Sequence, residues 1–179
     1  MNTLGATYLD SAIQRFLTYK TLGDMTFAQL EEKDLYFVPS EESNSIAVII
    51  QHMHGNMLSR WTDFLTTDGE KEGRNRDEEF NPPSCSKADL LTLWENGWRC
   101  VIDTLRSLKD EDLLKTISIR NEPLVVIDAI NRQLAHYPHH VGQIVYLGKM
   151  IRDHNWQSLS IKKGASGSFN KSMQEQHKR

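Results

Sequence analysis

The chain has 179 residues, of which 39% are hydrophobic and 25% are charged. This length predicts a single domain, and the composition is typical of a globular protein rather than a disordered or membrane-spanning one. The net charge of −3 argues against a dedicated nucleic-acid binder, which usually carries a basic excess. The charge is uneven, because residues 162–179 contain five basic residues and one acidic residue, so residues 1–161 carry −7.

The N-terminal segment has neither the basic region nor the apolar region of a signal peptide. No run approaches the ~18 apolar residues that cross a bilayer. The two cysteines, Cys85 and Cys100, are isolated, which argues against a disulfide scaffold and makes a reducing compartment the default. We therefore expect a soluble cytoplasmic protein that binds neither membranes nor nucleic acid.

The first half of the chain predicts two long helices. Apolar residues recur at three- and four-residue steps from Leu4 to Leu22, which predicts the first helix. A broken stretch follows, with room for one short helix around Phe27–Lys33 before Pro39. The second long helix begins at Asn44 or Ser45, both good N-caps, and runs to Leu65. Residues 66–84 are rich in Gly, Asn, Asp and Pro, which predicts a long surface loop.

The second half predicts two more long helices with a hairpin between them. The third helix begins near Ser86, where Asp89 completes a capping-box pattern, and runs to Leu108. Residues 115–126 alternate and are β-branched around Arg-Asn-Glu-Pro, as in a small hairpin. The fourth helix covers Ile127–Arg152. Four such helices joined by one long loop predict an all-α four-helix bundle over residues 1–154, followed by an extended tail, 155–179, packed on the bundle.

Two histidines on the fourth helix have the spacing of a metal site. His136 and His140 are four residues apart, so their rings share one helix face and can supply two nitrogens to one ion. His139 lies nearly opposite the apolar stripe, and we expect it to be solvated. Pro138 either kinks the helix harmlessly near its end or re-aims His136 and frees a backbone carbonyl.

A third nitrogen has two candidates on the second helix, His52 and His54, which lie about 200° apart on a helical wheel. The apolar stripe lies nearer His54, so the wheel mildly favours His54 as the interior residue. His52 instead shares a polar strip with Ser45, Asn56, Ser59 and Asp63, as in the wall of a wet pocket. The residues alone leave both candidates open.

Two segments resemble a known family. SIAVIIQHMHGN, followed by HYPHHVGQIVYLGK about 80 residues later, resembles the DinB-like superfamily of metal-binding four-helix bundles, which includes thiol-dependent S-transferases. The resemblance is closer to a DinB-like subfamily of unknown function and covers nearly the whole chain. It implies a four-helix bundle fold and an open site for a divalent transition metal. Imidazole ligands suit zinc, nickel, iron and copper, and of these we expect zinc or nickel.

The resemblance also assigns roles to residues. The first ligand of the family follows a Ser/Thr-Ile start by seven residues, which assigns that role to His52, seven residues after Ser45. The other two ligands are the H-x-x-x-H pair ahead of a Gly-Gln step, which are His136 and His140. His54 becomes the second choice for the first ligand. Apart from the resemblance, Asn56 lies one turn beyond His52 and Gln143 three residues past His140. Each could orient a bound substrate or water, or could be a structural polar residue that only supports the ligands.

A site with three neutral imidazoles leaves an ion its full charge and an open coordination position. Such an ion lowers the pKa of a bound water or deprotonates a thiol. The resemblance favours thiol S-transferase chemistry with a low-molecular-weight thiol and a small-molecule substrate. The alternatives are a metal-dependent hydrolase and a non-catalytic metal-binding stress or interaction protein. A homodimer is also expected, because Trp94, Trp98 and Trp156 add more apolar area than four helices readily bury.

Overall fold

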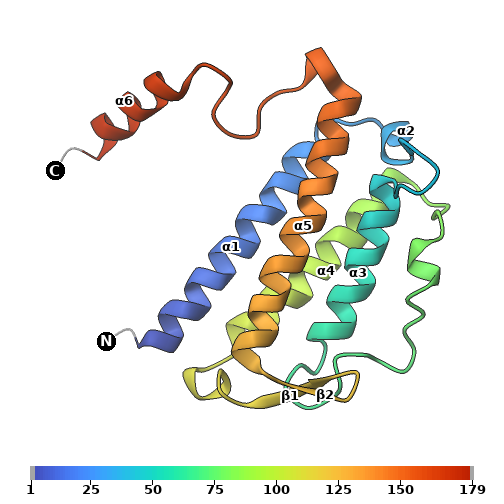
Figure 1. Cartoon of the computed structure of the whole chain (residues 1–179), viewed down its shortest axis with the longest axis vertical. Coiled ribbons are helices and arrows are strands. Elements are labelled where there is room, and N and C mark those ends of the chain that lie inside the picture. Colours follow the sequence, from blue (N-terminus) through green and yellow to red (C-terminus); the bar gives the residue numbers. More distant parts are fainter. Residues whose placement is uncertain (1–2, 178–179) are drawn as a thin grey trace.

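Four long helices dominate the computed structural model, which describes residues 3–177 (Figure 1). The helices, in chain order, are α1 (Leu4–Phe27), α2 (Glu32–Leu35), α3 (Ile46–Trp61), α4 (Lys87–Ser107), α5 (Val126–Arg152) and α6 (Ser166–Gln176). The strands β1 (Thr116–Ile119) and β2 (Glu122–Val125) form one antiparallel hairpin directly before α5. The prediction of an all-α fold with a small β-hairpin before the last long helix is therefore confirmed.

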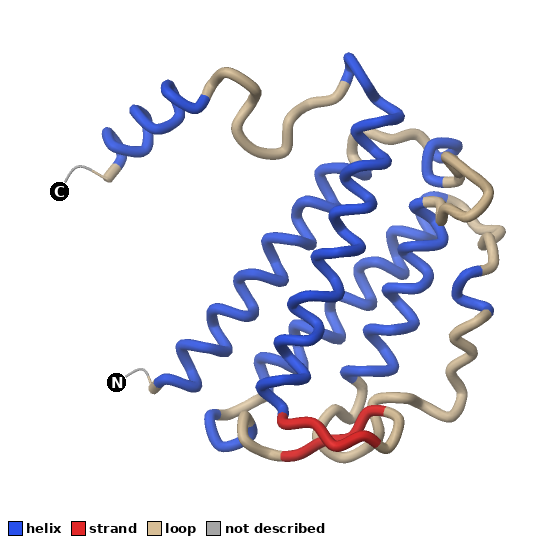
Figure 2. Tube along the Cα trace, in the orientation of Figure 1, coloured by secondary structure: helices blue, strands red, loops and turns tan. Residues whose placement is uncertain are grey.

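The helices α1, α3, α4 and α5 pack side by side (Figure 2). Aromatic side chains fill the space between them. Phe16 of α1 is fully buried, and its ring centroid lies 6.2 Å from that of Trp61, 6.1 Å from that of Trp98 and 5.8 Å from that of Tyr137. These three rings come from α3, α4 and α5, so one cluster joins all four helices.

Local sequence fixes where α3 and α4 begin. The hydroxyl of Ser45 accepts a hydrogen bond from the Val48 amide at 3.3 Å, which caps α3. Ser86 and Asp89 form the predicted capping box, since each side chain accepts from the other residue's backbone N–H. Both caps stand at the positions that the sequence predicts.

The hairpin turn holds the loop between α3 and α4. Arg120 and Asn121 both have positive φ, 57° and 61°, as a two-residue type I′ turn requires. The carboxylate of Asp68 accepts hydrogen bonds from both turn amides, at 2.8 and 2.9 Å. These bonds and a third from the Glu70 amide lower the pKa of Asp68. The start of the loop is thus tied to the end of the bundle.

Three segments differ from expectation. The first helix runs on to Phe27, and the short helix that follows lies at Glu32–Leu35, a few residues later than expected. Pro138, by contrast, lies inside α5 as the predicted span Ile127–Arg152 requires. Residues 166–176 form α6, although the sequence suggests an irregular tail, and α6 stands away from the bundle with none of its residues buried (Figure 1).

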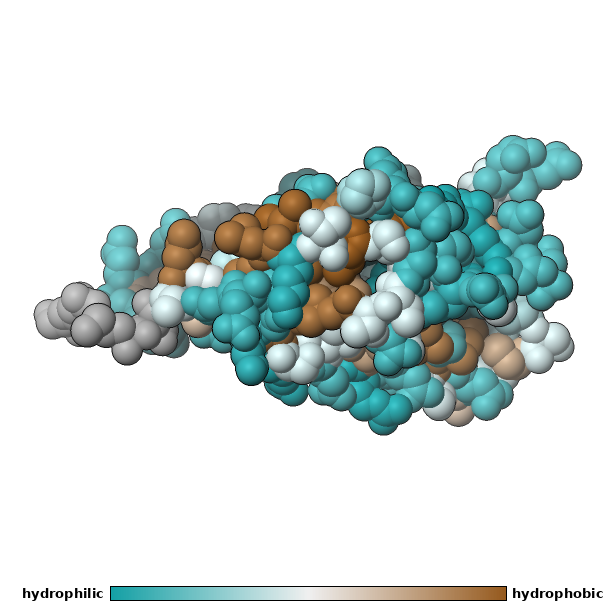
Figure 3. Space-filling model, turned by 90° about the horizontal axis from the view of Figure 1, so that it is seen from below, coloured by the Kyte–Doolittle hydropathy of each residue, from teal (hydrophilic) through white to brown (hydrophobic). Residues whose placement is uncertain are grey.

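The hairpin end of the molecule exposes some apolar surface. Leu4 and Leu114 are 88% and 80% exposed, and apolar surface shows between hydrophilic residues in the view from this end (Figure 3). Within residues 3–177, no helix combines the length and the apolarity needed to cross a bilayer.

Candidate metal centre

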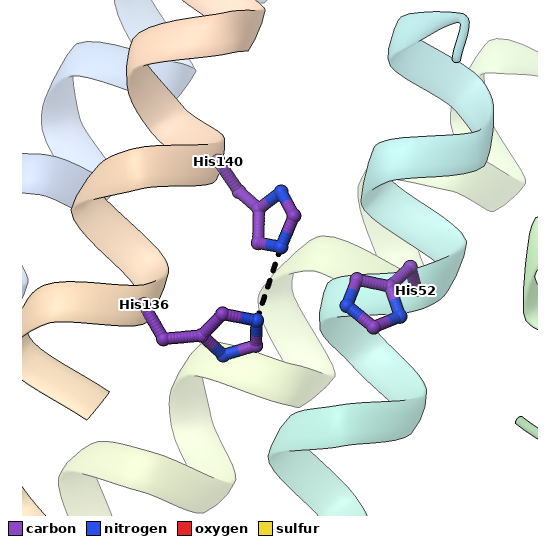
Figure 4. A group of neighbouring side chains, drawn as sticks. All are labelled: His52, His136 and His140. Atoms are coloured by element: carbon purple, nitrogen blue, oxygen red, sulfur yellow. Dashed lines mark hydrogen bonds between the residues drawn. The ribbon is translucent and has the colours of Figure 1, made fainter. Parts of the chain in front are cut away.

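Three histidines converge between α3 and α5. His52 projects from α3, and His136 and His140 project from α5 toward it (Figure 4). The ligand atoms of the three side chains all lie within 4.8 Å of one another. The Nε2 atoms of His136 and His140 are 3.0 Å apart. The structure therefore brings together the three residues to which the sequence assigns the ligand roles, as a group that could bind a metal ion.

The spacing of these nitrogens suits one small cation. Two imidazole nitrogens bound at about 2.0–2.1 Å to a tetrahedral ion stand roughly 3.3 Å apart. The 3.0 Å between the Nε2 atoms of His136 and His140 is close to that value. The unbroken course of α5 through Pro138 keeps the two rings one turn apart on the same face. Small ring movements would bring all three nitrogens onto one ion.

Each histidine is held from behind through its Nδ1 atom. The partners of Nδ1 are Glu79 Oε2 at 2.9 Å for His52, Gln133 Oε1 at 3.2 Å for His136 and Gln143 Oε1 at 2.8 Å for His140. Because each partner is an oxygen acceptor, each Nδ1 carries the hydrogen. The Nε2 lone pairs are then free to face the centre of the group, as in metal-binding histidines oriented by a second hydrogen bond.

The electrostatics of the group keep His136 and His140 neutral. Burial lowers the pKa of His136 to about 3, and the nearby rings of His140 and His52 act in the same direction. Burial also lowers the pKa of His140. Both side chains are thus unprotonated at neutral pH, which is the form that binds a metal.

A buried ion pair stands behind His52. Arg74 donates from Nε to Glu79 Oε1 at 2.6 Å and from Nη2 to Glu79 Oε2 at 2.8 Å. Burial alone would raise the pKa of Glu79, but the hydrogen bonds from Arg74 and His52 hold it below its usual value. Glu79 is therefore a carboxylate. Arg74 also contacts Glu70, which accepts hydrogen bonds from Arg60 and Arg120.

The surface of α3 is shaped to receive this carboxylate. A Cβ atom at Gly55, about one turn after His52, would come within 2.7 Å of Glu79 Cδ. Gln51 donates from Nε2 to the carbonyls of Glu78, Glu79 and Asn81, at 3.0–3.1 Å. The 3₁₀ turn at Glu78–Phe80 is thus held against α3, and the Phe80 ring packs on His52 with centroids 4.6 Å apart.

His52 is the buried, interior histidine of α3. The prediction from the helical wheel that His54 is the interior residue is therefore wrong. The wheel assumes one buried stripe, whereas the loop covers the polar face of α3 and most residues of the helix are buried. His54 instead lines a cleft of about 690 Å³ between α3 and the loop, whose lining also includes Arg74 and Glu79. His139 is exposed, as expected.

The two polar residues expected beside the ligands lie in different places. Gln143 contacts His140, as described above, and its Nε2 lies 3.3 Å from the Nε2 of His139. Asn56 is buried and accepts a hydrogen bond from the Tyr137 hydroxyl at 3.2 Å, so it contacts a core residue rather than a ligand.

Sequence reasoning missed three residues that contact the ligands or hold those contacts. Gln133 precedes His136 by three residues, the same spacing that relates His140 to Gln143, so the helix pattern could have revealed it. Glu79 and Arg74 lie in an irregular loop without periodicity. The one signal in the sequence that points to them is Gly55, because a glycine inside a helix often marks a close approach by another segment.

The site leaves part of an ion's coordination sphere free of protein. Among residues 3–177, the group contains no fourth histidine, cysteine or carboxylate. Cys85 and Cys100 are free thiols and half-buried outside it. Three protein ligands with an open position are typical of catalytic rather than structural zinc sites.

Comparison with known proteins gives a family without an assigned activity. The model of the family "Protein of unknown function (DUF1572)" matches residues 3–165, which include all four long helices and the three histidines. No curated protein matches the chain. The matched range ends one residue before α6 begins. The chain therefore belongs to the DUF1572 family of proteins of unknown function.

Proposed function

We propose that the chain is a member of the DinB-like superfamily and a divalent-metal-dependent enzyme that transfers a small substrate group to a low-molecular-weight thiol. One observation supports this most strongly: His52, His136 and His140 turn their free nitrogens toward one point while each opposite nitrogen donates to an oxygen. Zinc or nickel suits three imidazoles. A divalent ion held there would supply the positive charge that favours a thiolate over a thiol at neutral pH.

The side chains of the chain itself would do three things in this reaction. The three histidines would place the positive charge between α3 and α5. Gln133, Gln143 and Glu79 hold the rings in the required tautomer and orientation. In the transfer, a bond forms between the thiol sulfur and an electrophilic carbon as the bond from that carbon to its leaving group breaks, and the thiol proton is released to solvent.

The test is a thiol-transfer assay on protein purified without a histidine tag. Protein reconstituted with Zn²⁺ or Ni²⁺ is mixed with a low-molecular-weight thiol and a chromogenic alkyl or aryl halide, and the thioether product is measured. We expect turnover that requires both metal and thiol and that is lost in His140→Ala. Metal-dependent release of the leaving group without thiol would instead assign a hydrolase. A metal-loaded protein inactive in both assays would assign a non-catalytic metal-binding protein.

We also propose a homodimer in which α6 of each chain packs on the other copy. An 11-residue helix is marginal in water by itself, and Phe169 and Met173, one turn apart, remain 44% and 37% exposed. Charge favours a second copy as the partner, because residues 162–179 carry +4 and residues 1–161 carry −7.

Sedimentation tests the dimer directly. The full chain should sediment as a dimer at micromolar concentration, and the double variant Phe169→Ser/Met173→Ser should sediment as a 20.6 kDa monomer. Ser168→Gln, elsewhere on α6, is the matched control and should stay dimeric. A full chain that is monomeric at these concentrations, or a double variant that stays dimeric, would contradict this role of α6.

A further inference from the structure

We propose that Arg74 and Glu79 are positioning residues of the metal centre, and that docking of the 66–84 loop on α3 and metal binding by His52 stabilise each other. This inference rests on the proposed metal site. It assigns a role to a loop that contributes no ligand to the group of three histidines.

The contacts of Glu79 all serve one orientation of its carboxylate. Its Oε2 accepts from His52 Nδ1 and from Arg74 Nη2, and its Oε1 accepts from Arg74 Nε. The Glu79 side chain is 9% exposed and the Arg74 side chain is 5% exposed, so solvent does not screen the pair as it would at the surface. A bidentate arginine fixes a carboxylate geometrically as well as electrostatically. Arg74 therefore aims Glu79 at His52.

The helix opposite is built to admit the carboxylate. Gly55 leaves the space that Glu79 occupies, and any side chain there would push the carboxylate away from α3. Glycine in a helix interior is destabilising relative to alanine. An ion pair with only a structural role at the surface would not require a glycine at position 55, because long side chains reach one another over an ordinary helix surface.

The tautomer of His52 couples metal binding to docking of the 66–84 loop. An ion bound through Nε2 leaves the proton of a neutral imidazole on Nδ1, where it is donated to Glu79. Without an ion, the proton can move to Nε2, and the hydrogen bond to Glu79 is then lost. Metal binding thus favours the state in which the loop is docked. By thermodynamic linkage, the docked loop raises metal affinity by the same factor.

Glu79 differs from the partners of the other two ligands. Gln133 and Gln143 are neutral and belong to α5, the helix that also carries His136 and His140. Glu79 is charged and comes from the loop, 27 residues after His52 in the chain. A charge-assisted hydrogen bond is about twice as strong as a neutral one. His52 is thus the one ligand whose orientation depends on a segment that can undock.

The closing experiment compares metal affinity and loop protection in variants of the full chain. Affinity for Zn²⁺ is measured by competition with a chromophoric chelator. Glu79→Gln keeps an acceptor oxygen for His52 but loses the charge that pairs with Arg74, and it should weaken binding by about 10-fold, the lower end of the effect of removing a partner of a metal-bound histidine. Glu72→Gln is the matched control, because Glu72 lies in the same loop with an exposed side chain, and it should bind as the wild type does. Arg74→Gln tests the same claim if Glu79→Gln fails to fold.

Trypsin supplies a readout of the loop that does not depend on activity. Lys71 and Arg76 lie within the loop, and Arg76 is half exposed. Zn²⁺ should slow cleavage after these residues several-fold in the wild type and much less in Glu79→Gln. Wild-type affinity in both Glu79→Gln and Arg74→Gln, or cleavage unchanged by Zn²⁺ in the wild type, would overturn the inference while leaving the metal site intact. A wild type that binds no Zn²⁺ would overturn the metal site itself.

Discussion

Replacing His136 with alanine is expected to abolish metal binding at the histidine group. The substitution removes one of three ligands and leaves only His140 on α5, so an ion would keep two protein ligands from two different helices. Loss of one chelating imidazole should lower affinity by at least 10–100-fold, the range seen when only a partner of a ligand is removed. Elemental analysis after gel filtration should then find roughly one ion per wild-type chain and almost none per variant chain.

His139→Ala is the matched control for this experiment. His139 is exposed and lies on the same helix, three residues further on, so the change has a similar effect on helix propensity. Its ring lies near Gln143 and packs on the outside of the His140 ring at 5.3 Å between centroids, but it is not part of the group. The control should keep its metal. Equal metal content in His136→Ala and the wild type would show that the ion is bound elsewhere.

Gly23→Ala is expected to destabilise the fold, although alanine is the better helix former. A Cβ atom at position 23 would lie 2.8 Å from Trp94 Cη2, in the contact between α1 and α4. Trp94 cannot easily move, because it is buried, packs edge-on against Phe27 at 5.1 Å between ring centroids and donates from Nε1 to Asp24 at 2.7 Å. Overpacking of this kind costs about 1–3 kcal/mol. Thermal or urea unfolding should therefore show a net loss of stability.

Gly142→Ala makes the same chemical change where space is free. Apart from the adjoining backbone of α5, no atom of residues 3–177 lies within 4 Å of a Cβ built at this position. The free energy of unfolding should rise by about 0.5–1 kcal/mol, because alanine replaces glycine inside a helix without a clash. Effects of the same sign in the two variants would contradict the packing described for α1 and α4.

Periodicity and capping residues were sufficient to predict the bundle. Helix-spaced apolar residues and the caps at Ser45 and Ser86 place α3 and α4, and the alternation around residues 115–126 places the hairpin. These features are local, so the sequence carries them directly. The His136–His140 pair is of the same kind, because a four-residue step on a helix fixes the geometry.

The remainder of the site depends on contacts between distant segments. A helical wheel of α3 ranks His54 above His52, because it cannot include the loop that covers the polar face of the helix. The family resemblance names His52, which lies with His136 and His140 in the group of three, since a motif carries tertiary information that a wheel lacks. Glu79 and Arg74 were not predicted, because neither periodicity nor spacing relates a loop residue to a helix 20 or more residues away.

The most direct test of the metal centre is anomalous X-ray diffraction, at the zinc and nickel absorption edges, from crystals of tag-free protein purified without added chelator. We predict a single strong peak between α3 and α5, with Nε2 of His52, His136 and His140 each about 2.0–2.1 Å away and no fourth protein ligand. The absence of a peak there in protein grown and purified with both metals, or a peak bound by other residues, would contradict this metal centre.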